Sequence, residues 1–228
     1  VILFLILLAS LFFFQIKKQQ SEYHKNELQV WASMKEGITY IYRTKEILGA
    51  LCLDMFAVLF GGAVAMIPVY ASDILKVGAD GFGLLNAASD IGSMMIIVTL
   101  SFIPLRKNQG KILIGVVAGF GLCIIGFGLS KLYWLSFLFL MLSGIFDGIS
   151  VVIRGTIVQL KTPDHIRGRV MSANSIFIMS SNEMGQFESG VAAKLLGVVR
   201  SVVFGGTMTV LIALFVGKFV PKLRKMEY

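Results

Sequence analysis

Long uncharged runs of apolar residues recur along the whole chain and limit what it can fold into. The seven stretches are Val1–Ile16, Ile47–Tyr70, Phe82–Leu105, Ile112–Ser130, Leu132–Ile153, Val170–Leu196 and Val198–Val220. Most reach the about 20 residues that a helix needs to cross a bilayer. Hydrophobic residues make up 56% of the chain and charged residues only 15%, whereas soluble domains carry about 25% charged residues. The sequence predicts an all-α polytopic membrane protein and excludes a soluble enzyme, a disordered tail and a disulfide-rich secreted domain.

Lysine and arginine residues gather in every second connection between the apolar stretches. They are most frequent in residues 17–46, after positions 105 and 160, and in the C-terminal tail. Because basic loops stay in the cytoplasm, we expect the linker and the C-terminus on that side. This pattern explains the formal net charge of +8 without nucleic acid as a partner.

The chain begins with Val1 inside an apolar run. We therefore expect residues 1–16 to be the end of a membrane helix that starts further upstream. Residues 17–46 are then a cytoplasmic linker, residues 47–221 a bundle of six transmembrane helices, and residues 222–228 a cytoplasmic tail. On this interpretation the chain is part of a longer protein.

The linker contains a helical pattern. Apolar residues recur at spacings of three and four, which is typical of one helix face: Leu28, Trp31, Met34, Ile38 and Ile41. Such a helix either lies on the inner membrane surface or packs on neighbouring cytoplasmic loops. The pattern alone does not distinguish the two.

Ionisable and amide side chains inside four of the apolar stretches indicate a polar interior. A charge in hydrocarbon is costly, so such residues usually face protein or water. The candidates for a substrate or proton pathway are Asp54, Asn86, Asp90, Asp147, Arg154, Asn182, Glu183, Gln186 and Glu188. The stretches 112–130 and 198–220 carry almost no polar residues in their centres. We expect these two to face lipid and the other four to line a cavity.

Two interpretations stay open for each intramembrane acid. It can form a structural ion pair or hydrogen bond, or it can contact substrate or carry a proton. Glu183 and Asp54 are the first candidates for the second role, and Glu183 lies near the middle of the most polar helix. Asp147 and Arg154 share a helix face, two turns apart. Unless the arginine side chain reaches back to the aspartate, we expect each to meet a partner on another helix, as a gate or structural charge pair.

A short basic connection follows the fifth stretch. It carries a proline, an aspartate, a glycine and two arginines: Pro163, Asp164, Arg167, Gly168 and Arg169. Proline and aspartate suit the first turn of a helix, and arginines bind carboxylates or the carbonyl groups that end a helix. We expect a cytoplasmic gate motif here, with simple anchoring by positive charge as the alternative.

Several of these segments resemble the major facilitator superfamily of membrane transporters. The run Pro163–Val170 resembles the loop between that family's tenth and eleventh helices, and Gly81–Ala88 resembles the start of its eighth helix. The stretches Asp147–Gln159, Glu183–Gly190 and Met34–Tyr40 are similar to one branch, the bacterial siderophore and macrolide-type drug exporters, and in particular to enterobactin-exporter-like members. Residues 104–111 depart from the family by lacking an Asp, which argues against a latch in that loop.

The resemblance implies that the seven stretches are helices six to twelve of a twelve-helix fold, with helices seven, eight, ten and eleven around the cavity. It implies a secondary transporter of the bacterial inner membrane that exports a drug or siderophore. Coupling to proton entry would make it an antiporter. Alternating access would need the missing N-terminal half.

The expected partners are a small-molecule substrate, protons, the lipid bilayer and that other half. A non-transporting membrane scaffold or sensor is the alternative function. We expect no enzyme, cofactor or metal, because the sequence shows no phosphate-binding loop, metal-ligand cluster or nucleophile–base pair.

Overall fold

A computed structural model describes residues 27–103, 105 and 107–220. Residues 1–32 and 33–228 are two compact units, and the packing below is that of the second unit. The expectations for residues 1–16 and 222–228 lie outside the described residues. The described part is helical without strands, which confirms the all-α prediction.

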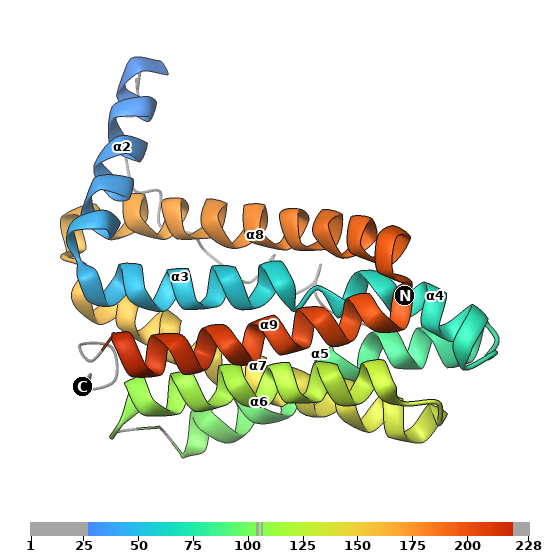
Figure 1. Ribbon diagram of the computed structural model, residues 1–228. Coiled ribbons are helices and arrows are strands. Elements are labelled where there is room, and N and C mark those ends of the chain that lie inside the picture. Colours follow the sequence, from blue (N-terminus) through green and yellow to red (C-terminus); the bar gives the residue numbers. More distant parts are fainter. Residues whose placement is uncertain (1–26, 104, 106, 221–228) are drawn as a thin grey trace, which may run out of the picture. The chain divides into compact units, whose positions relative to one another are not determined.

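Helix α2, Glu27–Arg43, begins in the first unit and ends in the second. The long helices that follow are α3 (Lys45–Phe60), α5 (Ala79–Phe102), α6 (Gln109–Leu129), α7 (Tyr133–Lys161), α8 (Arg167–Leu196) and α9 (Val198–Phe219). They run back and forth between the same two ends of the bundle (Figure 1). Five helical segments are long and apolar enough to cross a membrane, and α8, which has 30 residues, is the polar exception among the long helices.

The stretch 47–70 is not one continuous helix. After α3 the chain forms a 3₁₀ turn (η1, Ala63–Met66), a short α4 (Ile67–Val69) and a π-helical turn (η2, Tyr70–Ile74). The break falls at Gly61 and Gly62. A Cβ on Gly62 would lie 2.6 Å from Ser189 Oγ and 2.8 Å from the Gly185 carbonyl oxygen. Only glycine therefore lets this part of the chain approach α8 so closely.

Other expected boundaries also differ. Helix α7 continues eight residues beyond the expected end at Ile153, and α8 begins at Arg167 rather than at Val170. Pro163 is not in the first turn of α8. It precedes a separate 3₁₀ turn, η3 (Asp164–Ile166), because the two helices are joined by a bend instead of a simple helix start.

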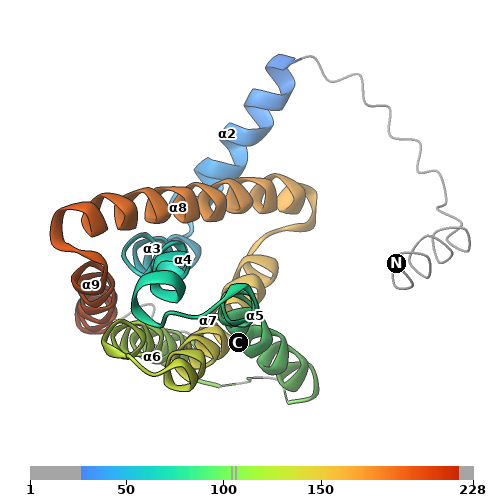
Figure 2. The same cartoon turned by 90° about the vertical axis from the view of Figure 1, so that its right-hand side faces the viewer.

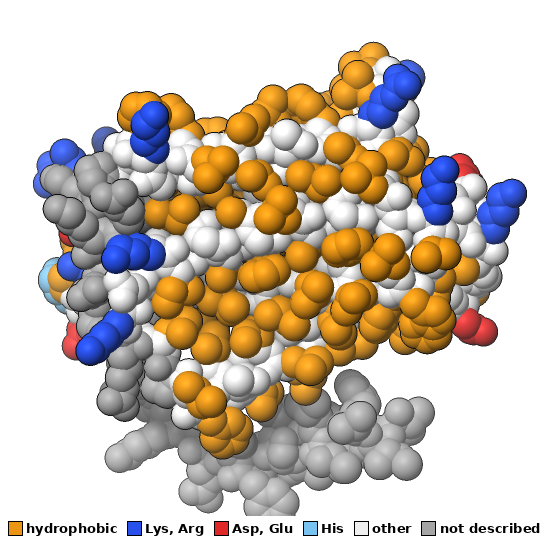
Figure 3. Space-filling view, turned by 60° about the horizontal axis from the view of Figure 1, so that its bottom comes forward, with side chains coloured by type: hydrophobic (Ala, Val, Ile, Leu, Met, Phe, Trp, Pro, Cys, Tyr) orange, Lys and Arg blue, Asp and Glu red, His pale blue; other side chains and the backbone are white. Residues whose placement is uncertain are grey.

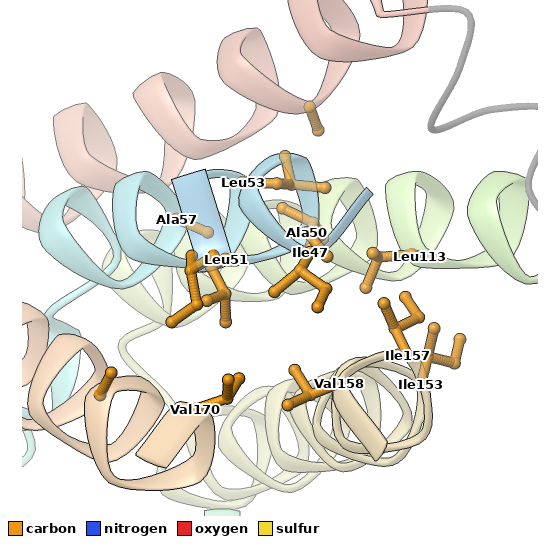
Figure 4. Packing of buried hydrophobic residues seen from close by; sticks show 14 of the residues in the cluster. Ile47, Ala50, Leu51, Leu53, Ala57, Leu113, Ile153, Ile157, Val158 and Val170 are labelled. Carbon is orange, nitrogen blue, oxygen red and sulfur yellow. The ribbon is translucent and has the colours of Figure 1, made fainter. Parts of the chain in front are cut away.

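The helices pack through two apolar clusters, one towards each end of the bundle. The first joins α3, α6, α7 and α8 through side chains such as Ile47, Leu113 and Ile157, which are fully buried (Figure 4). The second surrounds Tyr70 and Phe127, whose rings lie 4.5 Å apart. Burial of such side chains excludes solvent and fixes the relative positions of the helices.

Charged side chains gather at the two ends, and apolar ones cover the middle of the surface (Figure 3). We call the end where α3 begins and α9 ends the basic end. Its described basic residues include Lys45, Lys107, Lys111, Lys161, Arg167, Arg169 and Lys218, and the opposite end has Lys76, Lys131, Lys194 and Arg200. An apolar band between two charged rims is what a bilayer requires of a spanning protein.

Candidate functional site

A buried ion pair lies in the interior of the bundle. Arg154 of α7 donates through Nη1 to Asp54 of α3, and the two side chains are only 7% and 9% exposed. The Arg154 Nε group also donates to Ser150 Oγ at 3.2 Å. Arg154 therefore has the partner on another helix that its position in the sequence led us to expect.

Asp147 lies beside this pair. Its Oδ1 is 3.9 Å from Nη2 of Arg154, and its side chain is 42% exposed. Asp147 thus lies within reach of Arg154 of its own helix, whose side chain reaches back along the shared face. Asp54, Arg154 and Asp147 form a triad of two carboxylates and one guanidinium.

An open cavity of about 370 Å³ borders the triad. Its polar lining comes from Asp147, Asn182, Glu183 and Gln186, together with Ser89. Three of these lie on α8, where Gln186 follows Glu183 by three residues and Asn182 by four, so that one side of the helix carries all three. Four of the residues singled out from the sequence therefore lie together.

The interrupted part of α3 forms another wall of this cavity. Gly61, Gly62 and Val64 line it, and Phe120 of α6 closes it from the side. In membrane proteins, interrupted helices are tolerated where they are buried in protein or line a cavity. The lining by α6 departs from the expectation that this helix only faces lipid.

A smaller pocket adjoins Asp54 of the buried pair and shares lining residues with the cavity. Asp54, Asp147 and Ser150 line this second pocket, and Phe120 and Val58 belong to both. Asp147 is thus the one acid of the triad that lines both spaces.

The remaining candidates lie elsewhere. Asn86 and Asp90 are exposed, one turn apart on α5, and do not line the cavity. Glu188 is partly buried and lines a different, mostly apolar groove with Leu59 and Phe187. Glu183 and Glu188 therefore lie on different faces of α8, as their five-residue spacing predicts.

The basic connection holds α7, α8 and the end of α2 together. Arg167 pairs with Asp164 and also donates to the carbonyl of Thr162 at 3.4 Å. Arg169 pairs with Glu36 of α2. A Cβ on Gly168 would meet open space, so this glycine is not required by a close approach.

The second half of the linker helix packs on these loops. Ile41 is fully buried, and the hydroxyl of Tyr40 donates to the carbonyl of Lys161 at the end of α7. A Cβ on Gly37 would collide with the backbone of Arg169. For residues 33–43, the structure thus favours packing on neighbouring loops over a helix that only lies on the membrane surface.

Among the described residues, no group of three or more His, Cys, Asp or Glu side chains could hold a metal ion.

The family model of transmembrane secretion effectors, a major facilitator-type family, matches residues 1–228. The chain belongs to this transporter family. No curated protein and no solved structure matches it. The transporter is therefore an integral membrane protein, and its apolar helices are its transmembrane segments.

Several residues that the structure brings to the site of this transporter were not among those expected from the sequence. Ser150 accepts from Arg154, Phe120 lines both spaces, and Glu36 pairs with Arg169. Only Ser150 had a signal, because it lies one helical turn before an intramembrane arginine. Glu36 is separated from its partner by 133 residues, and no local pattern links the two.

Proposed function

We propose that this transporter exports a small molecule in exchange for protons by alternating access. The observation that carries the proposal is the open cavity bordered by Glu183 and Asp147, with the buried Arg154–Asp54 pair directly behind it. In the family arrangement, residues 47–221 would form the C-terminal six-helix half. Residues 1–16 would end the sixth helix, and the other half would close the cavity.

The triad supplies a site for one proton. With both carboxylates ionised, Asp54, Asp147 and Arg154 carry one net negative charge, and a single bound proton makes the group neutral. Because charges interact strongly where water is scarce, this change alters the balance between the conformations of the transporter. Asp147 is the entry point, since it is the member that lines the cavity.

The polar lining supplies the substrate site. Asn182 and Gln186 offer amide donors and acceptors, and Glu183 offers a negative charge. Arg154 does not line this cavity, because it is buried and engaged with Asp54. The lining therefore suits a cationic or neutral polar drug-like molecule better than an acidic siderophore.

The basic connection supplies the gate. The pairs Arg169–Glu36 and Arg167–Asp164 hold the end of α2 and the start of α8 at the basic end. We assign this end to the cytoplasm of a bacterial inner membrane, because it carries most of the described basic residues. Opening towards the cytoplasm then requires the Arg169–Glu36 contact to part.

Transport by the full-length protein in inverted membrane vesicles tests the proposal. A panel of fluorescent cationic dyes should accumulate when the vesicle interior is acidic, and an uncoupler should abolish the accumulation. We expect Asp147→Asn to abolish proton-driven accumulation, and Glu183→Gln to raise KM more than it lowers kcat. Asp80→Asn, in the exposed first turn of α5, is the matched control and should transport normally.

Two results would contradict the proposal. Dye uptake that is insensitive to the uncoupler would exclude proton coupling, as would full activity of the Asp54→Asn/Asp147→Asn double variant. Absence of flux for every dye and siderophore tested, in protein that is folded and inserted, would favour a scaffold or sensor instead.

A further inference from the structure

A second, wholly apolar groove lies on the outer side of the bundle between α3 and α9. Its volume is about 620 Å³, and it shares no residue with the transport cavity. One wall is formed by Gly49, Cys52, Phe56 and Phe60, and the other includes Leu211 and Phe215. The proposed transport cycle does not use this groove.

The course of α8 explains why the groove is open. Helices α8 and α9 meet at Gly197, at the end opposite the basic end. From there α8 slants across α3 and away from α9, as the end-on view shows (Figure 2). Towards the basic end the contact between α3 and α9 is therefore no longer covered by α8.

A lysine lies near the basic end of each wall of the groove. Lys45 precedes Gly49 by four residues, and the wall residues 49, 52, 56 and 60 follow at spacings of three and four, so Lys45 lies on the same face of α3. Lys218 follows Phe215 by three residues and Leu211 by seven, which places it beside these two at one edge of the α9 wall, whereas Ile212, Val216 and Val220 form the rest of that wall.

Both lysines are exposed, and neither forms an ion pair with a described carboxylate. Lys218 Nζ lies 5.6 Å from the ring centroid of Phe219. Glu46 is the nearest acid in the sequence, but it lies one residue, about 100°, around α3 from Lys45. The end of the groove is therefore positively charged.

The length of the groove matches one leaflet of a bilayer. From Gly49 to Phe60 the wall on α3 rises about 16 Å by helical geometry, and half of the hydrocarbon core is about 15 Å. A single acyl chain that starts at the basic end would thus lie along the groove to the middle of the membrane.

We propose that the α3–α9 groove binds an acyl chain of an anionic phospholipid, with the phosphate held between Lys45 and Lys218. Apolar walls of leaflet length suit the chain, and two cations that pair with no described carboxylate suit an anionic headgroup. A zwitterionic lipid has the same chains but less net charge to offer the lysines.

Tryptophan quenching by brominated lipids tests this inference in the full-length protein. Trp31, Trp134 and any tryptophan outside residues 1–228 are replaced by Phe, and Phe56→Trp places a reporter in the wall of the groove. The protein is reconstituted with phosphatidylcholine that contains rising fractions of phosphatidylglycerol, and one of the two lipids is brominated in its chains. We expect brominated phosphatidylglycerol to quench Trp at position 56 at mole fractions where brominated phosphatidylcholine does not.

The lysines are tested in the same assay. The double variant Lys45→Gln/Lys218→Gln should weaken the preference for the anionic lipid, by roughly fivefold for each lysine. Lys107→Gln/Lys111→Gln removes two charges at the same end of α6 and is the matched control, with no expected change. Lys45→Arg/Lys218→Arg should keep the preference. If the glutamine variant does not fold, loss of the preference at high salt in the unsubstituted groove tests the same charges.

Three outcomes would overturn the proposal. The first is equal quenching by the two brominated lipids, and the second is an unchanged preference in the lysine double variant. The third is absence of quenching by either lipid together with disulfide cross-linking of two copies through Cys52, which lines the groove. That result would show that a second copy of the protein covers it.

Discussion

Arg154 carries a positive charge in the interior of the bundle. The stability of the folded protein therefore depends on the Asp54 carboxylate that faces this charge. Removal of water from a charge costs several kcal/mol, and the charge of Asp54 offsets this cost only while both partners are present. The predicted consequence is an asymmetry between single and double substitutions.

Arg154→Met should destabilise the protein by about 3–5 kcal/mol, because Asp54 is left buried without its partner. The double variant Arg154→Met/Asp54→Asn should regain most of this loss, since the remaining charge of the triad, on Asp147, is 42% exposed. Thermal unfolding of the purified protein in detergent measures both. Arg167→Met, at an exposed ion pair, is the control and should change stability by less than about 1 kcal/mol. A double variant no more stable than the single one would contradict this account.

At the scale of elements, α5 and α7 pack so closely that their backbones touch. A Cβ on Gly144 would collide with the carbonyl oxygen of Ser89, whereas a Cβ on Gly155 of the same helix would meet nothing within 4 Å. Small residues allow this approach between membrane helices.

Gly144→Ala should therefore separate α5 from α7 and destabilise the protein by about 1–3 kcal/mol, as overpacking does. Gly155→Ala should be neutral, or stabilising by up to about 1 kcal/mol, because alanine favours helix and space is available. Unfolding midpoints of the two variants make the comparison. Similar midpoints would mean that the close contact does not hold these helices together.

The Glu36–Arg169 ion pair between α2 and α8 is expected to contribute little to the free energy of folding. The side chains of Glu36 and Arg169 are 47% and 37% exposed, and ion pairs this accessible contribute less than about 1 kcal/mol. Glu36→Gln should leave the unfolding midpoint nearly unchanged but accelerate dye uptake in vesicles if opening of the gate limits the rate. The exchanged pair Glu36→Arg/Arg169→Glu should restore the original rate. Stability that falls by several kcal/mol would show a structural role instead.

The sequence predicted the described membrane helices to within a few residues, except where two elements meet. The apolar periodicity of residues 82–105 or 198–220 is local and needs no partner to be recognised. The break at Gly61–Gly62 coincides with the close approach of α8, and the pair of Arg154 and Asp54 joins residues 100 positions apart. Such features depend on residues far apart in the chain.

The candidate site could be predicted only in part, because some of its features also depend on residues far apart in the chain. Asn182, Glu183 and Gln186 stand out because polar residues are rare in a membrane helix. That Asp147 and not Asp54 borders the cavity follows from helix rotation and packing, which spacing within one helix does not determine. Asp90 and Asn86 have the same polar signal and yet lie outside the cavity.

At the scale of the whole molecule, water and lipid should contact different faces of the bundle. In a variant without native cysteines, Asn182→Cys should react with a charged, water-soluble thiol reagent, because this position lines the open cavity. Leu214→Cys, on the exposed apolar face of α9, should react only with a lipophilic maleimide. Mass spectrometry of the labelled full-length protein measures both. Reaction of Leu214→Cys with the charged reagent would contradict the membrane placement of α9.

The interruption of α3 has a mechanical consequence. A continuous helix transmits rotation along its whole length. The backbone hydrogen bonds of α3 end at Gly61–Gly62, so the chain can bend at this point. Residues 63–74, which pack on α6 through Tyr70 and Phe127, can then move together with α6 while α3 stays anchored through Asp54 to Arg154. Movement at the end opposite the basic end therefore requires bending at two glycines and leaves the buried ion pair intact.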